Sequence, residues 1–475
     1  MTGEDLVLAI DNGSQSTKVL IVDASGSVRA SAKVPLRPYA SPVPGRSEHP
    51  DDDIWDSIVL ATRRAVDVLG SAEATRIRAV GLCTIRFCRA VLREDGSLAQ
   101  PVMSWMDERL SRAYRDEQPD ARFVTTSSGY IAMRMTGERR DSAGNYQGMW
   151  PVDTRTWDWS ADDAEFSRTG LRRDGVFELI PPGGELGRLL PDVAARMGVR
   201  AGIPVIATSN DKAVEALGAG LRGDDDALLS LGTYVATMRP DSGVRSDVRH
   251  SWTNFASEPG RYLMESHGVR RGMWTISWFR RLLSVTGVEP TDDELNAGAA
   301  DVPPGANGLV VSLDWLAPSE QQWRRGAIVG FDGSQDAFHI YRAILEAIAI
   351  TTHAADARAR SEAGRDLSGL IVTGGGSASA TMLRILAAVY GVPVRVPAVN
   401  DAAGMGAAIC AAVACGMHDS WSDAVDAMVS FPTRVDVEPA LEAAYATVIG
   451  RYGAVIPRVQ ELFRAESSTA VGKVS

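Results

Sequence analysis

Two copies of one short pattern, about 220 residues apart, constrain the fold of this chain more than any other feature of its sequence. In the first copy, residues 6–24, two apolar runs are joined by the polar turn Asp11-Asn12-Gly13-Ser14. In the second copy, residues 227–238, two further apolar runs are joined by Gly232-Thr233-Tyr234. Short apolar runs joined by polar, glycine-containing turns predict antiparallel strands. The repetition predicts a duplicated architecture with a cleft between its halves.

Helical and strand patterns follow each copy. Apolar residues recur at helical spacing over Ile54 to Leu69 and over Tyr341 to Arg358, and the apolar runs Ile77 to Leu82 and Leu370 to Val372 predict strands. This alternation predicts mixed α/β layers. The segment Ala402 to Cys415 is rich in Ala and Gly, which suits a helix that packs closely on its neighbours.

Length and composition bound the class of protein. The 475 residues suit two or three domains, and we expect the boundary near Gly223, in an acidic stretch. The net charge of −11 disfavours binding to nucleic acid or to an anionic membrane. Two acids precede the first apolar run and no stretch approaches roughly 18 apolar residues, so we expect no export signal and no membrane span. The cysteines (Cys83, Cys88, Cys410 and Cys415) lack Cys-x-x-Cys spacing, which predicts reduced, mostly buried thiols and a cytoplasmic protein.

Three glycine-containing turns are candidates for phosphate binding. The first, Asp11 to Lys18, combines backbone N–H groups, hydroxyls, a carboxylate and an ammonium, a composition suited to magnesium and phosphate. The second, Gly232-Thr233, offers backbone donors that a phosphate can approach closely. The third, Gly374-Gly375-Gly376-Ser377, lies between a predicted strand and a predicted helix. Each turn is also compatible with plain structural punctuation, and none has the spacing of a Gly-x-Gly-x-x-Gly fingerprint or a P-loop.

Asp211 follows the predicted strand Pro204 to Ala207 and precedes a helix of small residues. In this position a carboxylate can cap the helix or act as a general base directed into a cleft, and position alone favours the cap. Arg86, Trp105 and Asp107 lie near predicted strand ends, where guanidinium, indole and carboxylate groups suit a polyhydroxylated ligand. A surface ion pair over a packed Trp is the alternative interpretation. The six His residues are scattered and indicate neither a nucleophilic triad nor a transition-metal site.

Taken in order, these elements resemble the FGGY family of carbohydrate kinases, within the sugar kinase, Hsp70 and actin superfamily, and xylulokinase-like members in particular. The resemblance covers most of the chain. It rests on six segments: Ala9 to Ser14 with Lys18; Val102 to Arg109, with Trp105, Asp107 and Arg109; Met135 to Glu138 with Gly148 to Trp150 and Trp157 to Ser160; Pro204 to Gly220 around Asp211; Ser230 to Thr233; and Thr373 to Ser377 with Ala403 to Ala408.

The resemblance implies two ribonuclease-H-like (actin-like ATPase) domains flanking a central cleft. Residues 1–222 would bind sugar and carry the first phosphate motif, residues 223–475 would bind nucleotide, and the last helix would pack back on the N-terminal domain. The implied activity is ATP-dependent phosphorylation of a hydroxyl of a small sugar or polyol, favouring a ketose such as a pentulose. The family also implies a homodimer.

The resemblance also assigns residues to roles. Asp211 would be the general base, Asp11 would hold Mg²⁺ through water, and Arg86, Trp105, Asp107 and Asp211 would contact the acceptor. The remaining implied residues bind ATP: Gly13, Ser14, Lys18, Gly232, Thr233, Gly374, Gly375, Gly376 and Ser379.

The chain departs from the family pattern on the sugar side. Arg86-Phe87 stands where xylulokinases carry Met-His, and the segment between Arg109 and Met135 is several tens of residues shorter than usual. A second hypothesis is therefore a catalytically silent nucleotide-binding homologue that acts as a regulatory or assembly protein. The presence of both Asp11 and Asp211 favours the enzyme.

Overall fold

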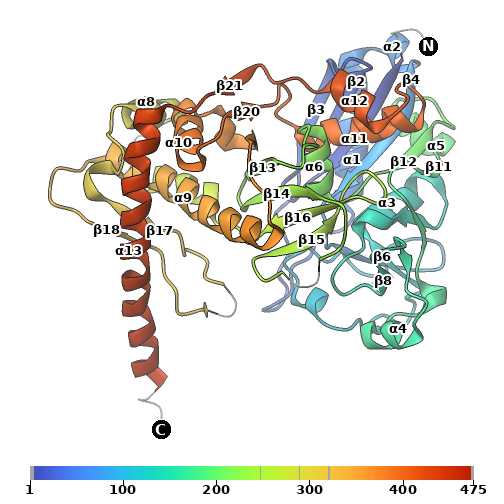
Figure 1. Cartoon of the computed structure of the whole chain (residues 1–475). Coiled ribbons are helices and arrows are strands. Elements are labelled where there is room, and N and C mark those ends of the chain that lie inside the picture. The colour runs from blue at the N-terminus through green and yellow to red at the C-terminus, as the bar shows by residue number, and fades with distance from the viewer. Residues whose placement is uncertain (1–4, 246–247, 288, 319–320, 472–475) are drawn as a thin grey trace.

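Two twisted β-sheets form the two halves of the protein (Figure 1). The structure is a computed structural model, and it describes residues 5–245, 248–287, 289–318 and 321–471. The first sheet has the strand order β11-β12-β4-β1-β2-β3, and the second has the order β15-β16-β14-β13-β19-β20-β21. The strands of the first sheet are β1 (Leu6–Asn12), β2 (Ser16–Asp23), β3 (Val28–Pro35), β4 (Ile77–Thr84), β11 (Glu185–Arg188) and β12 (Pro204–Ala207). Those of the second are β13 (Asp226–Leu231), β14 (Val235–Asp241), β15 (Ser251–Phe255), β16 (Tyr262–Ser266), β19 (Gly369–Thr373), β20 (Val394–Val396) and β21 (Thr433–Val435).

The two sheets repeat one arrangement of strands. β1 pairs antiparallel with β2 and parallel with β4, and in the same way β13 pairs antiparallel with β14 and parallel with β19. Each antiparallel pair is the hairpin predicted from the repeated sequence pattern. The duplicated architecture is thus confirmed.

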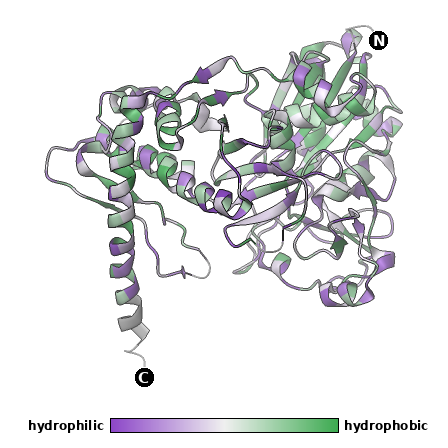
Figure 2. Cartoon of the chain, viewed as in Figure 1, coloured by the Kyte–Doolittle hydropathy of each residue, from purple (hydrophilic) through white to green (hydrophobic). Residues whose placement is uncertain are grey.

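Each sheet has an outer face covered by helices of its own half. The outer face of the first sheet packs on α1 (Asp53–Leu69), α3 (Ser127–Thr136) and α5 (Pro191–Met197). That of the second faces a hydrophobic core shared by α7 (Gly272–Leu283), α8 (Asp292–Ala300), α9 (Ala337–Ala363), α10 (Ala380–Tyr390) and α13 (Pro439–Val471). Figure 2 shows hydrophobic residues concentrated in the first sheet, whereas the peripheral helix α4 (Asp163–Thr169) is largely hydrophilic.

Smaller elements complete the two halves. In the first half these are α2 (Ser71–Ala74) and the strand pairs β5 (Arg89–Leu92) with β6 (Phe123–Thr126), β7 (Arg140–Ser142) with β10 (Glu178–Ile180), and β8 (Val152–Asp153) with β9 (Asp158–Trp159). In the second half β17 (Val310–Ser312) pairs with β18 (Ala327–Val329). All four cysteines are free thiols, and Cys83, Cys88 and Cys410 are buried. Within the described residues, no helix combines the length and apolar content needed to cross a bilayer.

Helices α6 (Asp211–Gly218) and α11 (Ala402–Ala414) lie between the inner faces of the two sheets. They approach so closely that a Cβ on Gly218 would lie 1.9 Å from the carbonyl oxygen of Ala402, and one on Gly406 would lie 2.0 Å from that of Val214. α11 and the following α12 (Trp421–Met428) cover the inner face of the first sheet, although they come late in the chain. The last helix, α13, instead packs on α10 and β17 in the second half. The segment that returns to the first half is therefore α11 with α12.

Candidate active site

Asp211 is the first residue of α6, at the end of the loop that follows β12. The residue that caps this helix is Asn210, whose Oδ1 accepts a hydrogen bond from the backbone N–H of Ala213 at 3.2 Å. The capping role that position alone favoured for Asp211 is therefore wrong. The carboxylate accepts one hydrogen bond, from the backbone N–H of Lys212, and its side chain remains about one quarter exposed (24%). Asp211 is thus free to meet a ligand.

The surroundings of Asp211 raise its proton affinity. Burial raises the pKa of its carboxyl above the ordinary value, and the positive charges of Arg86 and Lys212 lower it only in part. The Arg86 Nε lies 3.7 Å from Asp211 Oδ1. A partly buried carboxylate with a raised pKa suits a general base.

Arg86 is held from the opposite half of the protein. It follows β4 in the first half, and its Nη1 and Nη2 each donate a 2.8 Å hydrogen bond to the carboxylate of Glu265, on β16. Its guanidinium lies over the rings of Phe87 and Trp252, 5.1 and 4.9 Å from their centroids. Burial alone would lower the pKa of Arg86, but Glu265 and Asp211 hold it above its ordinary value. Arg86 therefore stays charged beside Asp211.

The first predicted phosphate turn carries a carboxylate and an ammonium. Asp11 on β1 faces Lys18 on β2, and Lys18 Nζ lies 3.3 Å from both Asp11 Oδ2 and Asp401 Oδ1. Burial, with the charge of Asp401, raises the pKa of Asp11 to about 7. The N–H of Gly13 donates to the carbonyl of Ser16, so this donor closes the hairpin turn. Asp11 and Lys18 are the groups of this turn that can meet a charged ligand.

The second predicted phosphate turn joins β13 to β14. Gly232 is partly exposed and Thr233 is exposed, so both can be approached. The next residue, Tyr234, interacts electrostatically with Arg86. The structure therefore brings this turn to the same side of the molecule as the Arg86 and Asp211 pair.

The third turn links β19 to α10. Gly374 has a φ of 82°, and a Cβ there would lie 2.5 Å from the carbonyl oxygen of Leu231, so only glycine fits against the end of β13. A Cβ on Gly375 would meet no atom within 4 Å, which leaves this turn open to a flat ligand. Ser379 caps α10 through the N–H of Met382 and donates to Asn296 Oδ1 at 2.5 Å. Its hydroxyl thus has partners inside the protein.

Trp105 and Asp107 occupy one loop but differ in exposure. Trp105 is 48% exposed, whereas Asp107 is buried. The Asp107 carboxylate accepts hydrogen bonds from the backbone N–H of Ser47 and from Arg109. In this structure Asp107 fixes the loop, and Trp105 presents its ring to solvent.

Two acidic residues of this cluster were missed by sequence reasoning. Glu265 lies in the apolar strand Tyr262–Ser266, and an acid inside such a run was a usable signal of a buried ion pair. Asp401 precedes α11 and caps it through the N–H of Gly404. Nothing in the local sequence pairs Asp401 with Lys18, because the two are 383 residues apart.

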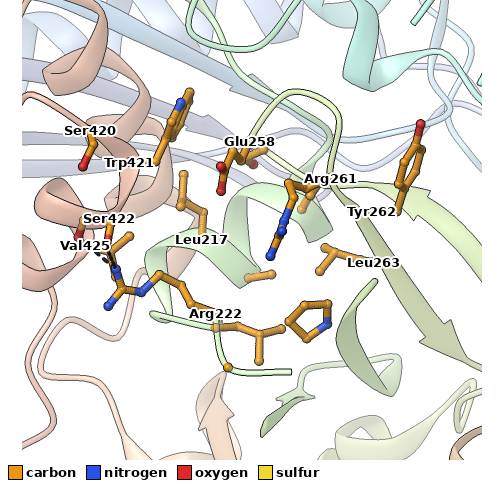
Figure 3. A pocket seen from close by; sticks show the side chains of 17 residues that line it. Leu217, Arg222, Glu258, Arg261, Tyr262, Leu263, Ser420, Trp421, Ser422 and Val425 are labelled. Atoms are coloured by element: carbon orange, nitrogen blue, oxygen red, sulfur yellow. Dashed lines mark hydrogen bonds between the residues drawn. The ribbon is translucent and has the colours of Figure 1, made fainter. Parts of the chain in front are cut away.

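A cavity of about 590 Å³ lies beside the inner helices (Figure 3). Its walls come from α6, from the turn between β15 and β16, and from α12. Arg222 lies at its edge, where it donates to the carbonyl and the hydroxyl of Ser422. None of the residues predicted to bind nucleotide or acceptor lines this cavity, so it is separate from the cluster around Asp211.

In the comparison with known proteins, both halves of the chain match the same protein family. The N-terminal domain profile of the FGGY family of carbohydrate kinases matches residues 6–116, and the C-terminal domain profile matches residues 227–415. An uncharacterized sugar kinase of Escherichia coli (strain K12) is 40% identical over 430 residues, which cover 89% of this chain and 87% of that protein.

Solved structures are similar over nearly the whole chain. Xylulose kinase from Rhodospirillum rubrum superposes with a TM-score of 0.83 at 23% identity, covering 97% of this chain and 100% of the other. Plasmodium falciparum glycerol kinase with ADP superposes with a TM-score of 0.82 at 16% identity, covering 96% and 98%. The expected fold, two actin-like ATPase domains flanking a central cleft, is confirmed.

Proposed function

The chain belongs to the FGGY family of carbohydrate kinases, and from this we propose that Asp211 is the general base that activates a hydroxyl of a small ketose or polyol. As a carbohydrate kinase it is a phosphotransferase with an alcohol group as acceptor. The observation that carries the proposal is the position of Asp211: it begins α6 but does not cap it, and its partly buried carboxylate is accessible and lies next to a cation.

Asp211 would accept the proton of the acceptor hydroxyl as that oxygen attacks the γ-phosphoryl group. Its raised pKa increases its strength as a base, while the charge of Arg86 favours the ionised carboxylate and limits the rise. Arg86 also has N–H groups that can orient an acceptor oxygen. Trp105, exposed in its loop, offers a flat apolar surface to the carbon skeleton of a sugar.

The residues around Asp11 fit MgATP. Asp11 and Asp401 are two carboxylates that flank Lys18, and the buried Asp401 Oδ2 and Asn12 Oδ1 have no hydrogen-bond partner among the described residues. Oxygen ligands of this kind suit Mg²⁺, whose coordination water and phosphate oxygens would complete. When bound, MgATP supplies the transferable phosphoryl group and neutralises its charge. The exposed turns at Gly232-Thr233 and at Gly375 would bind its phosphates and its adenosine.

The names of proteins that share this fold support our choice of acceptor class. Xylulose kinase and glycerol kinase, which share this fold, are named for a ketose and a polyol. We favour a ketose such as a pentulose. The catalytically silent alternative gains no support, since Asp11 and Asp211 are both present and the charge of Asp211 contributes to the raised pKa of Asp11.

The test is release of ADP from MgATP in the presence of tetruloses, pentuloses, hexuloses, tetritols, pentitols and glycerol. We expect one acceptor class to stimulate turnover in the wild type. Asp211→Asn should lower this turnover by roughly 10²–10⁴-fold, because the general base is lost. Nucleotide affinity and thermal unfolding should stay unchanged.

Asp163→Asn is the matched control, because Asp163 is exposed on α4. This variant should keep full turnover. Undiminished turnover in Asp211→Asn would refute its role as the base. Bound nucleotide without stimulation by any acceptor would instead favour a binding function.

A further inference from the structure

The bond between Arg86 and Glu265 joins the two halves beside Asp211. Both terminal nitrogens of Arg86 donate to the two carboxylate oxygens of Glu265, at 2.8 Å each, in a bidentate pair. Glu265 is 1% exposed on β16, between β15 and β14 of the second sheet, where Met238 and Trp252 flank it on the neighbouring strands. Such a carboxylate has one orientation. It therefore fixes where the guanidinium lies.

The Nε side of the Arg86 guanidinium, which Glu265 does not contact, faces Asp211. Its Nε lies 3.7 Å from Asp211 Oδ1, and the guanidinium is packed over Phe87 and Trp252. Each terminal nitrogen has a second N–H that the bidentate pair does not use. These N–H groups can donate to an acceptor hydroxyl, but the charge that they carry is already balanced by Glu265.

We propose that Glu265 is a positioning and specificity-determining residue: it holds Arg86 against Asp211 across the cleft and cancels its charge, so that the acceptor site takes uncharged ketoses and polyols and rejects sugar acids. The proposal rests on the proposed function in one respect, that the acceptor binds at Asp211. Glu265 itself acts through Arg86.

The charges of the cluster carry the second half of the proposal. A carboxylate on the acceptor would meet Asp211 and Glu265, two negative charges, with Arg86 as the cation between them. A second cation that acts on Asp211, Lys212, is paired with Glu215 at 2.7 Å. Since burying an unbalanced negative charge is costly, a sugar acid is disfavoured there. A neutral sugar does not pay this cost, because its hydroxyls need hydrogen-bond partners and not a net positive charge.

The chain contains a matched control for this ion pair. Arg239 on β14 forms a buried bidentate pair with Asp356 on α9, with Nε and Nη2 at 2.9 and 3.0 Å from the carboxylate oxygens. Asp356 is fully buried and lies on the outer face of the second sheet. Loss of its charge should destabilise the fold as loss of the Glu265 charge does, but should leave the acceptor site intact.

The experiment compares wild type, Glu265→Gln and Asp356→Asn in binding of D-gluconate, measured by calorimetry, and in kcat/KM for the neutral acceptor. We expect Glu265→Gln to bind gluconate at least tenfold more tightly than the wild type, because one of the two negative charges beside Arg86 is removed and the acceptor carboxylate can pair with Arg86 in its place. The same variant should lose about tenfold or more in kcat/KM for the neutral acceptor. Asp356→Asn should change neither quantity, although both variants should unfold at a lower temperature.

Gluconate binding does not depend on turnover, so it separates this proposal from the proposed function. If no neutral sugar is phosphorylated, the proposed function fails, and the gluconate comparison still decides the role of Glu265. Equal gluconate affinity in wild type and Glu265→Gln would overturn the proposal. Should Glu265→Gln not fold, Glu265→Asp replaces it: this variant keeps the charge and must still reject gluconate, and binding there would overturn the proposal equally.

Discussion

At Asp211, one neighbouring residue decides what the carboxylate can do. Asn210 supplies the hydrogen bond that the start of α6 needs, so the Asp211 oxygens are not used as a cap. Burial then raises the pKa of Asp211, and Arg86 and Lys212 limit the rise. The position thus combines an accessible carboxylate with increased basicity. This combination is what a base for phosphoryl transfer requires.

The raised pKa of Asp211 predicts the pH dependence of the kinase. Since the base must be ionised, kcat/KM should fall as the pH falls through the Asp211 pKa, at a pH above the range of an ordinary Asp. Lys212→Gln removes a positive charge that lowers this pKa, so the acidic limb of the profile should move to higher pH. Lys33→Gln, an exposed change on β3, should leave the limb in place. A limb that stays or moves to lower pH in Lys212→Gln would contradict this assignment.

Asp211, Arg86 and Asp11 could be predicted as candidate site residues from the sequence, because each lies in a local motif next to a predicted strand. Glu265 could not be predicted in this way, because it contacts Arg86 from 179 residues further along the chain. The predicted contact of Asp107 with the acceptor stays a prediction, and the structure adds that its carboxylate accepts hydrogen bonds from Ser47 and Arg109. Local sequence indicates the chemistry of a residue. The partner across the cleft depends on how two sheets face each other, which no local pattern encodes.

Among the elements, the crossing of α6 and α11 controls how close the two sheets lie. Gly218 and Gly406 allow backbone to touch backbone at this crossing. The Ala and Gly content of α11 predicted close packing, and this expectation is confirmed. Its partners were not predictable, because α11 packs on α6 and on the first sheet, far away in sequence. Strand and helix positions follow local periodicity and were largely predicted, whereas the pairing of helices with sheets was not.

A single methyl group should test this crossing. Gly218→Ala places a Cβ 1.9 Å from the Ala402 carbonyl and 2.3 Å from the Gly406 nitrogen, so the two helices must separate. We expect a loss of about 1–3 kcal/mol in the free energy of unfolding, measured by denaturant titration. Gly450→Ala is the control, since a Cβ there meets no atom within 4 Å in the long helix α13.

The control should be neutral or stabilising by up to about 1 kcal/mol, because Ala favours a helix more than Gly does. If Gly218→Ala unfolds at the same denaturant concentration as the wild type, the helices have room to adjust, and the crossing does not set the spacing of the sheets.

On the scale of the whole molecule, each half has its own outer core, but the inner face of the first sheet is completed by a late segment. Val7, Ala9 and Leu20 point inward and pack on α11 and α12. The two halves of the structure therefore do not correspond to the two sides of residue 223 in the sequence, because α11 and α12 come after this residue but pack on the first sheet. Residues 1–222 contain the first sheet without the helices that cover its inner face. The packing of α11 and α12 on the first sheet could not be predicted from the sequence. The boundary predicted near Gly223 marks a linker and not the limit of a hydrophobic core.

This arrangement predicts that residues 1–222 do not fold alone. The uncovered inner face would expose a contiguous apolar surface, and such surfaces drive aggregation. A fusion of residues 1–222 to residues 397–432 through a flexible linker of about ten residues restores α11 and α12. The linker is feasible because Gly218 lies against Ala402 and Gly220 lies against Phe431.

We expect the fusion to be a monomer with a cooperative thermal transition, measured by gel filtration and circular dichroism, and the fragment alone to aggregate or to melt without cooperativity. Ala408→Glu in the fusion should abolish the rescue, because Ala408 is fully buried against the first sheet. This result would show that the fusion folds because α11 packs on the first sheet, and not simply because the fragment has been made longer. A fragment 1–222 that melts cooperatively at the temperature of the fusion would show instead that the first half is an independent domain, and that α11 only docks on it.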